Sequence, residues 1–156
     1  MTTTDPVDQA RRLTRGRARA LAEADLRAGP PALDPETVGT KRYGLTDALD
    51  DLADAADPGE RLAVAGLVFD AAADLLLDHR RAWTGSGKWL PRRLLQADPR
   101  LGAALLDGHL RVAGAGDPAP LAGAASEVLG LTGGPLREGY RRTWRGTIDS
   151  VAAAGR

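Results

Sequence analysis

The stretch RLAVAGLVFDAAADLLLDHRRAW, residues 61–83, decides the fold. Alanine, leucine, valine and phenylalanine side chains would cover most of its circumference if it formed an α-helix. A helix that is apolar nearly all round is buried by the elements that surround it. Residues 61–83 therefore predict the central helix of a helical domain.

Five Asp-Pro pairs mark helix starts on both sides of this stretch. Asp is a preferred N-cap because its carboxylate accepts the free N–H groups of the first turn, and Pro is tolerated at the first helical position. Glycines at 29, 114, 116, 133 and 134 stand where helix ends are expected. The pairs are Asp5-Pro6, Asp34-Pro35, Asp57-Pro58, Asp98-Pro99 and Asp117-Pro118.

The whole chain reads as one all-α domain, residues 1–156, with residues 1–5 expected to be disordered. Alanine (29) and leucine (23) favour helices, whereas valine and isoleucine together number only eight. Short connections favour a largely antiparallel bundle of about six to seven helices, the second of which Gly39 or Gly44 could interrupt. The predicted helices span about 6–28, 35–55, 58–83, 90–97, 99–113, 118–131 and 136–153.

The composition excludes several classes of function. The chain has no cysteine, so disulfides and thiolate metal sites are excluded, and two histidines argue against a histidine metal centre; we expect no metal and no cofactor. A formal net charge of zero argues against a dedicated nucleic-acid or membrane-surface protein. No apolar run is long enough to span a bilayer. A soluble cytoplasmic protein is expected.

The charges are nevertheless segregated along the chain. Residues 44–79 carry nine acidic side chains and one basic one, whereas residues 80–100 carry six basic and one acidic. These sets could neutralise each other across the surface, where exposed pairs contribute about 0–1 kcal/mol each. Alternatively, they could line a bipolar cleft for a polar or zwitterionic molecule. The five arginines of residues 11–19 are interpreted as a solvated face.

Acidic side chains recur at helical spacing in two places. Tyr43, Asp47, Asp50, Asp51 and Asp54 gather on one side of the second helix, opposite its leucines. They form either an ordinary solvated face or a site for a cationic group. Asp70, Asp74 and Asp78 recur every four residues on the central helix, and Arg137, Arg141 and Arg145 do so on the last, which predicts an ion-pair ladder between them.

The two histidines have different predicted roles. His79 closes the central helix, where a cation stabilises the negative end of the helix dipole, although a pKa near 6.5 would also suit a general base. His109 lies in the middle of a helix without an obvious partner and is predicted to be a surface residue.

The segment WTGSGKWLPRR, residues 83–93, carries the most information about a site. A glycine-rich loop with Ser86 and Lys88 before a helix could hold an anion, although the spacing differs from that of a P-loop. The aromatic residues Trp83, Trp89, Tyr140 and Trp144 suggest a cluster, which is either core or a pocket wall.

The same segment resembles a known family. The chain between about residues 10 and 145 looks like the C-terminal helical domain of bacterial, especially actinobacterial, nucleotidyltransferases related to the aminoglycoside nucleotidyltransferases. The catalytic signature of their N-terminal domain, G-S-x-A/R-x-G followed by D-x-D, does not occur here. The matching residues are Trp83, Gly85, Gly87, Lys88, Trp89, Leu90, Pro91 and Arg92, then 116–118, 133–134 and 139–142.

The resemblance implies a stand-alone helical protein that binds a polar small molecule and performs no nucleotidyl transfer by itself. It could dock on a separate nucleotidyltransferase subunit or form a homodimer. The alternative is a small metabolic enzyme that uses the same pocket for acid–base chemistry, such as an isomerisation, cyclisation or elimination. Its candidate catalytic groups are Asp47, Asp50 and His79.

The expected pocket lies between the second helix, the end of the central helix, the glycine-rich loop and the last helix. Lys88 and Arg92 would hold an anionic or carbonyl group there. Asp47, with Asp50 or Asp51, would take a cationic or hydroxyl end. The residues predicted to bind the ligand are Tyr43, Asp47, Asp50, Asp51, Trp83, Lys88, Trp89, Arg92, Tyr140 and Trp144.

Overall fold

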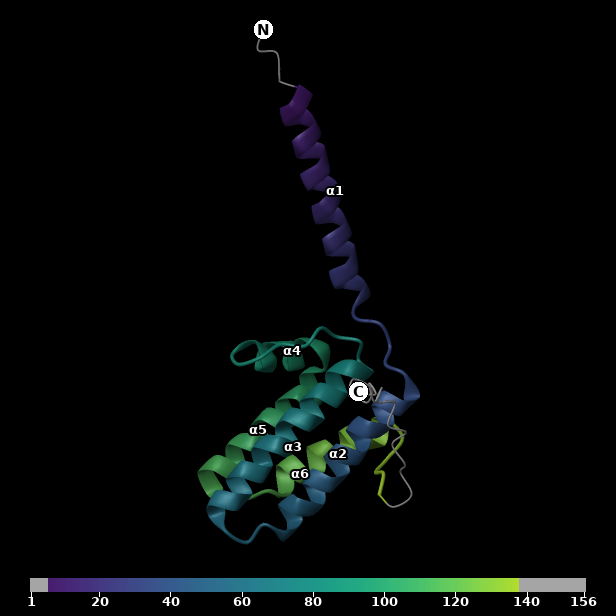
Figure 1. Ribbon diagram of the computed structural model, residues 1–156. Coiled ribbons are helices and arrows are strands. Elements are labelled where there is room, and N and C mark those ends of the chain that lie inside the picture. Colours follow the sequence, from purple (N-terminus) through teal and green to yellow (C-terminus); the bar gives the residue numbers. More distant parts are fainter. Residues whose placement is uncertain (1–5, 138–156) are drawn as a thin grey trace, which may run out of the picture.

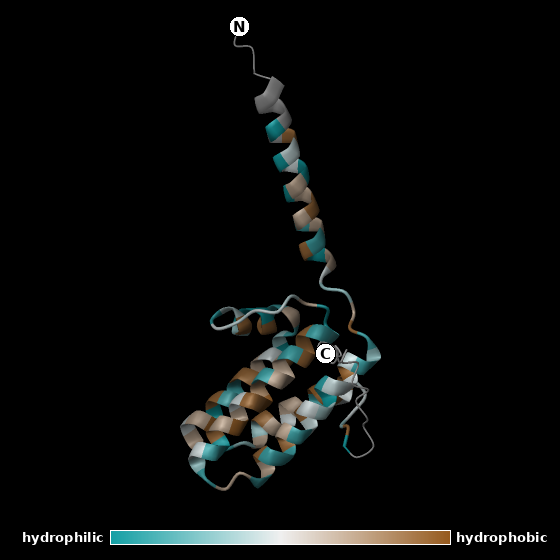
Figure 2. Cartoon of the chain, in the orientation of Figure 1, coloured by the Kyte–Doolittle hydropathy of each residue, from teal (hydrophilic) through white to brown (hydrophobic). Residues whose placement is uncertain are grey.

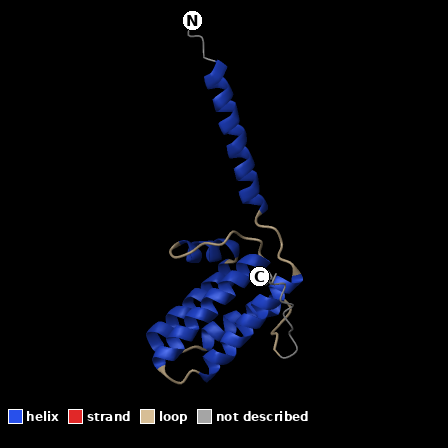
Figure 3. Cartoon of the chain, viewed as in Figure 1, coloured by secondary structure: helices blue, strands red, loops and turns tan. Residues whose placement is uncertain are grey.

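The computed structural model describes residues 6–137, with residues 6–10 and 12 described by their backbone only. This part of the chain contains six helices and no strand, which confirms the all-α prediction (Figures 1 and 3). None of these helices combines the length and the apolar character that a membrane span requires. The helices are α1 (Pro6–Ala28), α2 (Pro35–Asp54), α3 (Pro58–His79), α4 (Trp89–Ala97), α5 (Pro99–Ala115) and α6 (Ala119–Leu131).

Helices α2 to α6 pack around α3 and form what we call the body, residues 35–131. As the apolar pattern predicted, α3 is central: it packs against α2, α4, α5 and α6. Its buried side chains include Val68, Phe69 and Leu76. Figure 2 shows hydrophobic residues recurring along the helices of the body.

The Asp-Pro pairs start helices as predicted. Asp34 accepts a hydrogen bond from the backbone N–H of Thr37 (2.9 Å), and Asp98 accepts one from Leu101 (2.9 Å). Asp57 accepts from two N–H groups, those of Gly59 (2.7 Å) and Glu60 (3.1 Å). Asp117 accepts from Ala119 (3.1 Å), the first residue of α6. Asp5 lies outside the described residues.

The central helix ends four residues earlier than its predicted end at residue 83. Its last turn closes with hydrogen bonds from Arg81 N–H to Asp78 O (2.9 Å) and from Ala82 N–H to Leu77 O (2.9 Å). This pattern is a Schellman motif, which places Arg81 in the left-handed region with φ 52°. Glycine usually occupies that position, and an arginine there gave no sign of a helix end.

Two other predicted boundaries are also corrected. α2 continues through Gly39 and Gly44 without a break. Residues 136–137, where the last helix was expected to begin, are not helical, and residues 138–153 of that helix lie outside the described residues.

Helix α1 stands apart from the body, contrary to the expectation that neighbouring helices pack antiparallel. Figure 1 shows it projecting from the end of the body where α4 lies, and within residues 6–137 it packs against no other helix. All of its described side chains are exposed. Two contacts fix its last turn: Trp83 Nε1 donates to Leu26 O (3.2 Å), and Gly29 lies against the Arg81 carbonyl.

Candidate functional site

A groove of about 610 Å³ lies between α3 and the loop that leads into α4. It combines leucine and alanine side chains with two carboxylates from α3 and two hydroxyls from the loop. An apolar pocket with a few polar groups is the usual form of a small-molecule site. The lining residues are Leu67, Asp70, Ala71, Asp74, Leu77, Thr84, Gly85, Ser86, Gly87 and Leu90.

Local turn chemistry shapes the loop side of this groove. Gly87 has φ +54°, a conformation that costs glycine little, and it starts the turn into α4. Trp89 N–H donates to Ser86 O and Leu90 N–H donates to Gly87 O, both at 3.2 Å. Gly85 lies so close to α4 that a Cβ there would be 3.0 Å from Trp89 Cβ. The loop is therefore folded back onto α4.

Helix α4 is held in place by its contact with α5. Leu94 is fully buried, and Gly102 lies so close to it that a Cβ at residue 102 would be 2.7 Å from Leu94 O. This close approach fixes the position of Leu90, one turn earlier, at the groove. The groove is thus positioned by the body rather than by the loop alone.

Two of the three carboxylates in the acidic stripe of α3 pair with a residue that the sequence did not indicate. Lys41 Nζ donates to Asp74 (2.6 Å) and also to Asp78. Partial burial alone would lower the pKa of the Lys41 ammonium, but its bonds to the two carboxylates outweigh burial and raise the pKa above 10.5. The predicted ladder to the last helix is wrong for Arg137, which pairs with α2 instead.

Asp70 is the carboxylate of the groove that has no ion-pair partner within the described residues. It is exposed and lies one turn from Leu67 and from Asp74. An exposed carboxylate that lines a groove without a partner can pair with a cationic group of a ligand at little cost in desolvation free energy.

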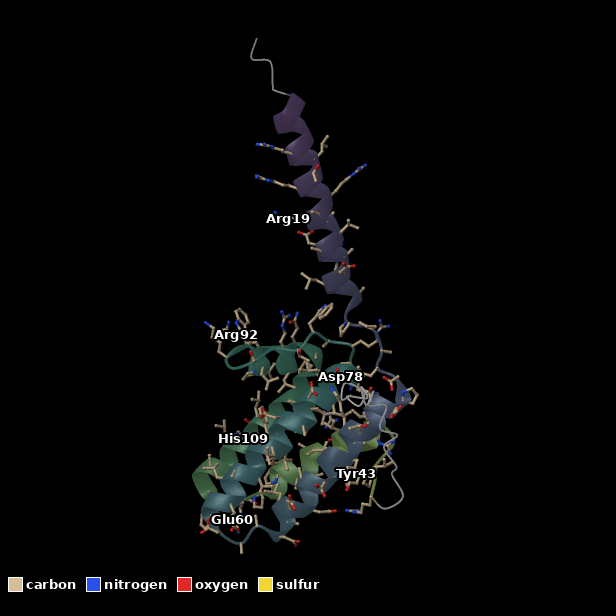
Figure 4. The ribbon with its side chains drawn as sticks, in the orientation of Figure 1. Arg19, Tyr43, Glu60, Asp78, Arg92 and His109 are labelled. Carbon is tan, nitrogen blue, oxygen red and sulfur yellow. The ribbon has the colours of Figure 1, made fainter. Side chains whose placement is uncertain are left out.

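Lys88, Trp89 and Arg92 form a cationic cluster on the outer side of α4. Lys88 Nζ lies 5.9 Å and the Arg92 guanidinium 4.9 Å from the centre of the Trp89 ring, within cation–π range. Figure 4 shows Arg92 at the end of the body from which α1 projects. All three side chains are exposed, and none of them lines the groove.

Trp83 has a structural role at the junction with α1. Besides its hydrogen bond to Leu26 O, it lines a separate cavity of about 180 Å³ with residues of α1 and α4. Its bond satisfies one of the carbonyls that a helix C-terminus leaves free.

The acidic residues of α2 do not meet the cationic cluster. Asp47, Asp51 and Asp54 are exposed, and α2 does not pack against α4 within the described residues. Tyr43 lies on α2, away from α4 (Figure 4). The structure therefore does not bring the predicted cationic and acidic ends together in one cleft, and their ligand roles stay predictions.

Asp50 is held by Arg137 in a two-pronged ion pair, with N···O distances of 2.9 and 3.1 Å. The Arg137 hydrogen bonds hold the pKa of the Asp50 carboxyl below 3.8. Both residues line a second cavity, of about 240 Å³, between α2, α6 and the segment after α6. An ion pair of this kind fastens that segment to α2.

The histidines differ in their surroundings. His79 is the last residue of α3 and is exposed, and its dipole role stays a prediction. His109 is not the surface residue that was expected: it is half-buried and stacks on Phe69, with ring centres 4.9 Å apart. Sequence spacing gave no sign of this contact between α3 and α5. Neither histidine lines the groove.

Tyr140, Trp144, Arg141 and Arg145 lie outside the described residues, so their predicted roles at the pocket stay predictions. Within residues 6–137, no cluster of three or more histidine or carboxylate side chains has a geometry that could hold a metal ion.

Comparisons with protein families, with curated proteins and with solved structures found no match to this chain. The resemblance to nucleotidyltransferases therefore rests on the short motifs around residues 83–92, 116–118 and 133–142 alone.

Proposed function

We propose that this chain is a binding module whose groove takes a small molecule with an amine and an apolar part. The observation that carries this proposal is the position of Asp70 among Leu67, Ala71 and Leu90 in the groove. The carboxylate would pair with the amine, while the apolar side chains would cover the hydrocarbon part of the ligand. Thr84 and Ser86 add hydroxyls for polar substituents.

The motifs shared with the acceptor-binding half of nucleotidyltransferases support the same function. The segment 83–92, which carries most of the resemblance, includes five residues that line the groove. In this proposal the chain presents or stores a small molecule, performs no nucleotidyl transfer by itself, and has a separate nucleotidyltransferase subunit as its candidate partner.

Binding is preferred to acid–base catalysis because the candidate catalytic groups do not line the groove. Asp47, Asp50 and His79 all lie elsewhere. In addition, the lowered pKa of Asp50 makes its carboxylate a weaker base than an ordinary aspartate.

Calorimetric titration with two matched probes tests the proposal. Phenethylamine and phenylacetate share an aromatic body and carry opposite charges. We expect saturable binding of phenethylamine, weakened about fivefold by Asp70→Asn because one exposed ion pair is worth up to about 1 kcal/mol. Asp51→Asn removes the same charge outside the groove and should leave the affinity unchanged.

Equal binding of the two probes, or equal effects of the two substitutions, would contradict the proposal. Binding that Asp70→Asn leaves intact would place the ligand elsewhere on the molecule.

A further inference from the structure

Helix α1 exposes apolar side chains that no other part of the described chain covers. Leu13 and Leu21 are 65% and 67% exposed, and Leu26 is 59% exposed. Most of the stability of helices in proteins comes from packing an amphipathic face rather than from intrinsic propensity. A partner for α1 is therefore to be sought outside its own body.

One face of α1 has a defined pattern. Leu13, Arg17 and Leu21 follow each other at intervals of four residues, so they lie on one face, and Ala20 and Ala24 flank them there. Small alanines allow close approach of another helix. The pattern is thus a leucine on either side of a single central cation.

The groove presents a matching pattern on α3. Leu67, Asp70, Ala71 and Asp74 share one face of that helix, and Leu67 is 62% exposed. Here the carboxylate of Asp70, unpaired within residues 6–137, lies next to exposed apolar surface. The two faces are complementary in both charge and hydrophobicity.

From these two faces we infer that α1 of a second copy of this chain docks on the α3 groove, with Arg17 on Asp70 and Leu13 and Leu21 against Leu67 and Leu90. The arrangement is reciprocal, so a two-fold dimer contains two identical contacts. It buries Leu13 and Leu21 of α1 and Leu67 of α3.

The shape of the molecule allows this exchange. α1 leaves the body at the end where α4 and the loop close the groove (Figure 1). It has 23 residues and α3 has 22, so each helix is about 34 Å long at the usual rise of about 1.5 Å per residue. When two bodies meet at these ends, each α1 can run along the partner's α3.

Docking of α1 within its own body is opposed by the junction. Gly29 has φ +73°, and a Cβ there would lie 2.1 Å from Arg81 O, so the chain passes tightly over the end of α3. Pro30 and Pro31 follow and restrict the backbone further. Together with the Trp83 bond to Leu26 O, this geometry directs α1 away from its own groove.

This inference goes beyond the proposed function, because the partner is a second copy and its helix covers the same groove. Dimer formation and occupation of the groove by a small molecule then exclude each other. The groove is closed in the dimer and open in the monomer.

Charge reversal on the full chain tests the contact. We expect the wild-type chain to sediment as a dimer in a concentration series, and Arg17→Asp and Asp70→Arg each to sediment as a monomer. An equimolar mixture of the two variants should recover a dimer, because the Arg17→Asp chain keeps a wild-type groove and the Asp70→Arg chain keeps a wild-type α1. Arg15→Asp makes the same charge change on another face of α1 and should stay dimeric.

A second readout does not depend on charge. The chain has no cysteine, so single cysteines report contacts cleanly. Under mild oxidation, Leu21→Cys mixed with Leu67→Cys should form a mixed disulfide. Leu21→Cys mixed with Leu110→Cys, a control on α5 whose exposure is similar to that of Leu67, should not.

Several outcomes would overturn the inference. They are a wild-type chain that is monomeric throughout the series, a dimer that Asp70→Arg leaves intact, and a mixture that fails to recover the dimer. Dimerisation that only α1 substitutions disturb would indicate pairing between two α1 helices instead. Because the partner's α1 would cover the groove of the wild-type dimer, the phenethylamine titrations are made on the Arg17→Asp monomer, with and without Asp70→Asn. Binding there that Asp70→Asn weakens supports the proposed function whatever the oligomeric state of the wild type, and its absence contradicts the proposed function without bearing on the dimer.

Discussion

α3 and α1 are helices of nearly equal length, and both are rich in alanine and leucine. In α3, eight residues are buried, and the helix is surrounded by four others. In α1, every described side chain is exposed. The difference follows from how the apolar residues of each helix are distributed. On α3 they cover most of the circumference, whereas on α1 they form only a narrow stripe, interrupted by Arg17. Helix propensity predicted both helices, but only this distribution tells which of them the body buries.

The largest expected effect is in the core of the body. Leu76 is fully buried in α3, and Leu76→Ala should lower the free energy of unfolding by about 3–5 kcal/mol, because it removes buried surface and leaves a cavity. Leu110→Ala, at a position that is 67% exposed on α5, should change it by less than about 0.5 kcal/mol. Urea denaturation followed by circular dichroism measures both, and similar losses would contradict the assigned core.

A smaller effect is expected where two helices of the body cross closely. A Cβ at Gly108 would lie 2.7 Å from Leu121 Cα, so Gly108→Ala should push α5 and α6 apart and cost about 1–3 kcal/mol. At Gly114, on the same helix, a Cβ would meet nothing within 4 Å. Gly114→Ala should therefore stabilise the protein slightly, through helix propensity. The same sign for both substitutions in a denaturation experiment would contradict this crossing.

Ion pairs should also differ between the body and α1. In the body, the Leu101 N–H and the Arg80 guanidinium donate hydrogen bonds to the Asp98 carboxylate. These bonds outweigh the effect of burial and hold the pKa of Asp98 below 3.8. The stability from this group is therefore fully present above about pH 4 and is lost as the pH falls through the lower pKa of the folded state. Asp98→Ala should cost about 1–2 kcal/mol at neutral pH, and this difference from the wild type should shrink as the solution is acidified toward pH 2.

The exposed pair of Arg19 and Glu23 on α1 is the control for Asp98. Glu23→Ala should change the free energy of unfolding by less than about 0.5 kcal/mol at any pH, since exposed pairs four residues apart on a helix contribute little. A cost for Asp98→Ala that stays constant between neutral pH and pH 2 would mean that the charge of Asp98 does not stabilise the body.

How far the sequence predicted the fold depends on the range of each signal. Asp34, Asp57 and Asp98 act on N–H groups two or three residues away, so their helix starts could be predicted closely. The end of α3 could not, because Arg81 adopts a conformation for which its side chain is not suited. The exposure of α1 was missed as well, although its narrow apolar stripe, interrupted by Arg17, was a signal of it in the sequence.

The candidate site was predicted less well because its contacts join residues far apart in the chain. The sequence indicated the glycine-rich loop as part of a site, and this loop lines the groove. It predicted the acidic stripe of α3 only as an ion-pair ladder, although Asp70 and Asp74 line the groove as well. It gave no sign that Lys41, 33 residues before Asp74, would pair with that carboxylate, or that Arg137 would pair with Asp50. Many arginines could satisfy a given carboxylate, and packing selects among them. The available signal was Leu67, a leucine that helical spacing places beside Asp70 and Asp74.

The smallest expected effect on stability tests the comparison between the buried helix α3 and the exposed helix α1 most directly. In the Arg17→Asp monomer, Leu21→Ala should leave the free energy of unfolding of the body unchanged within about 0.5 kcal/mol, because Leu21 contacts no other helix there. In the wild-type chain the same substitution should weaken the dimer by about tenfold or more, since burial of a leucine side chain contributes about 1.5–3 kcal/mol. Denaturation of the monomer and sedimentation equilibrium of the dimer measure the two quantities. A loss of more than about 1 kcal/mol in the monomer would show that α1 packs on its own body after all. An unchanged dissociation constant would instead remove Leu21 from the interface, because a leucine that becomes buried in the dimer cannot be shortened to alanine without weakening it.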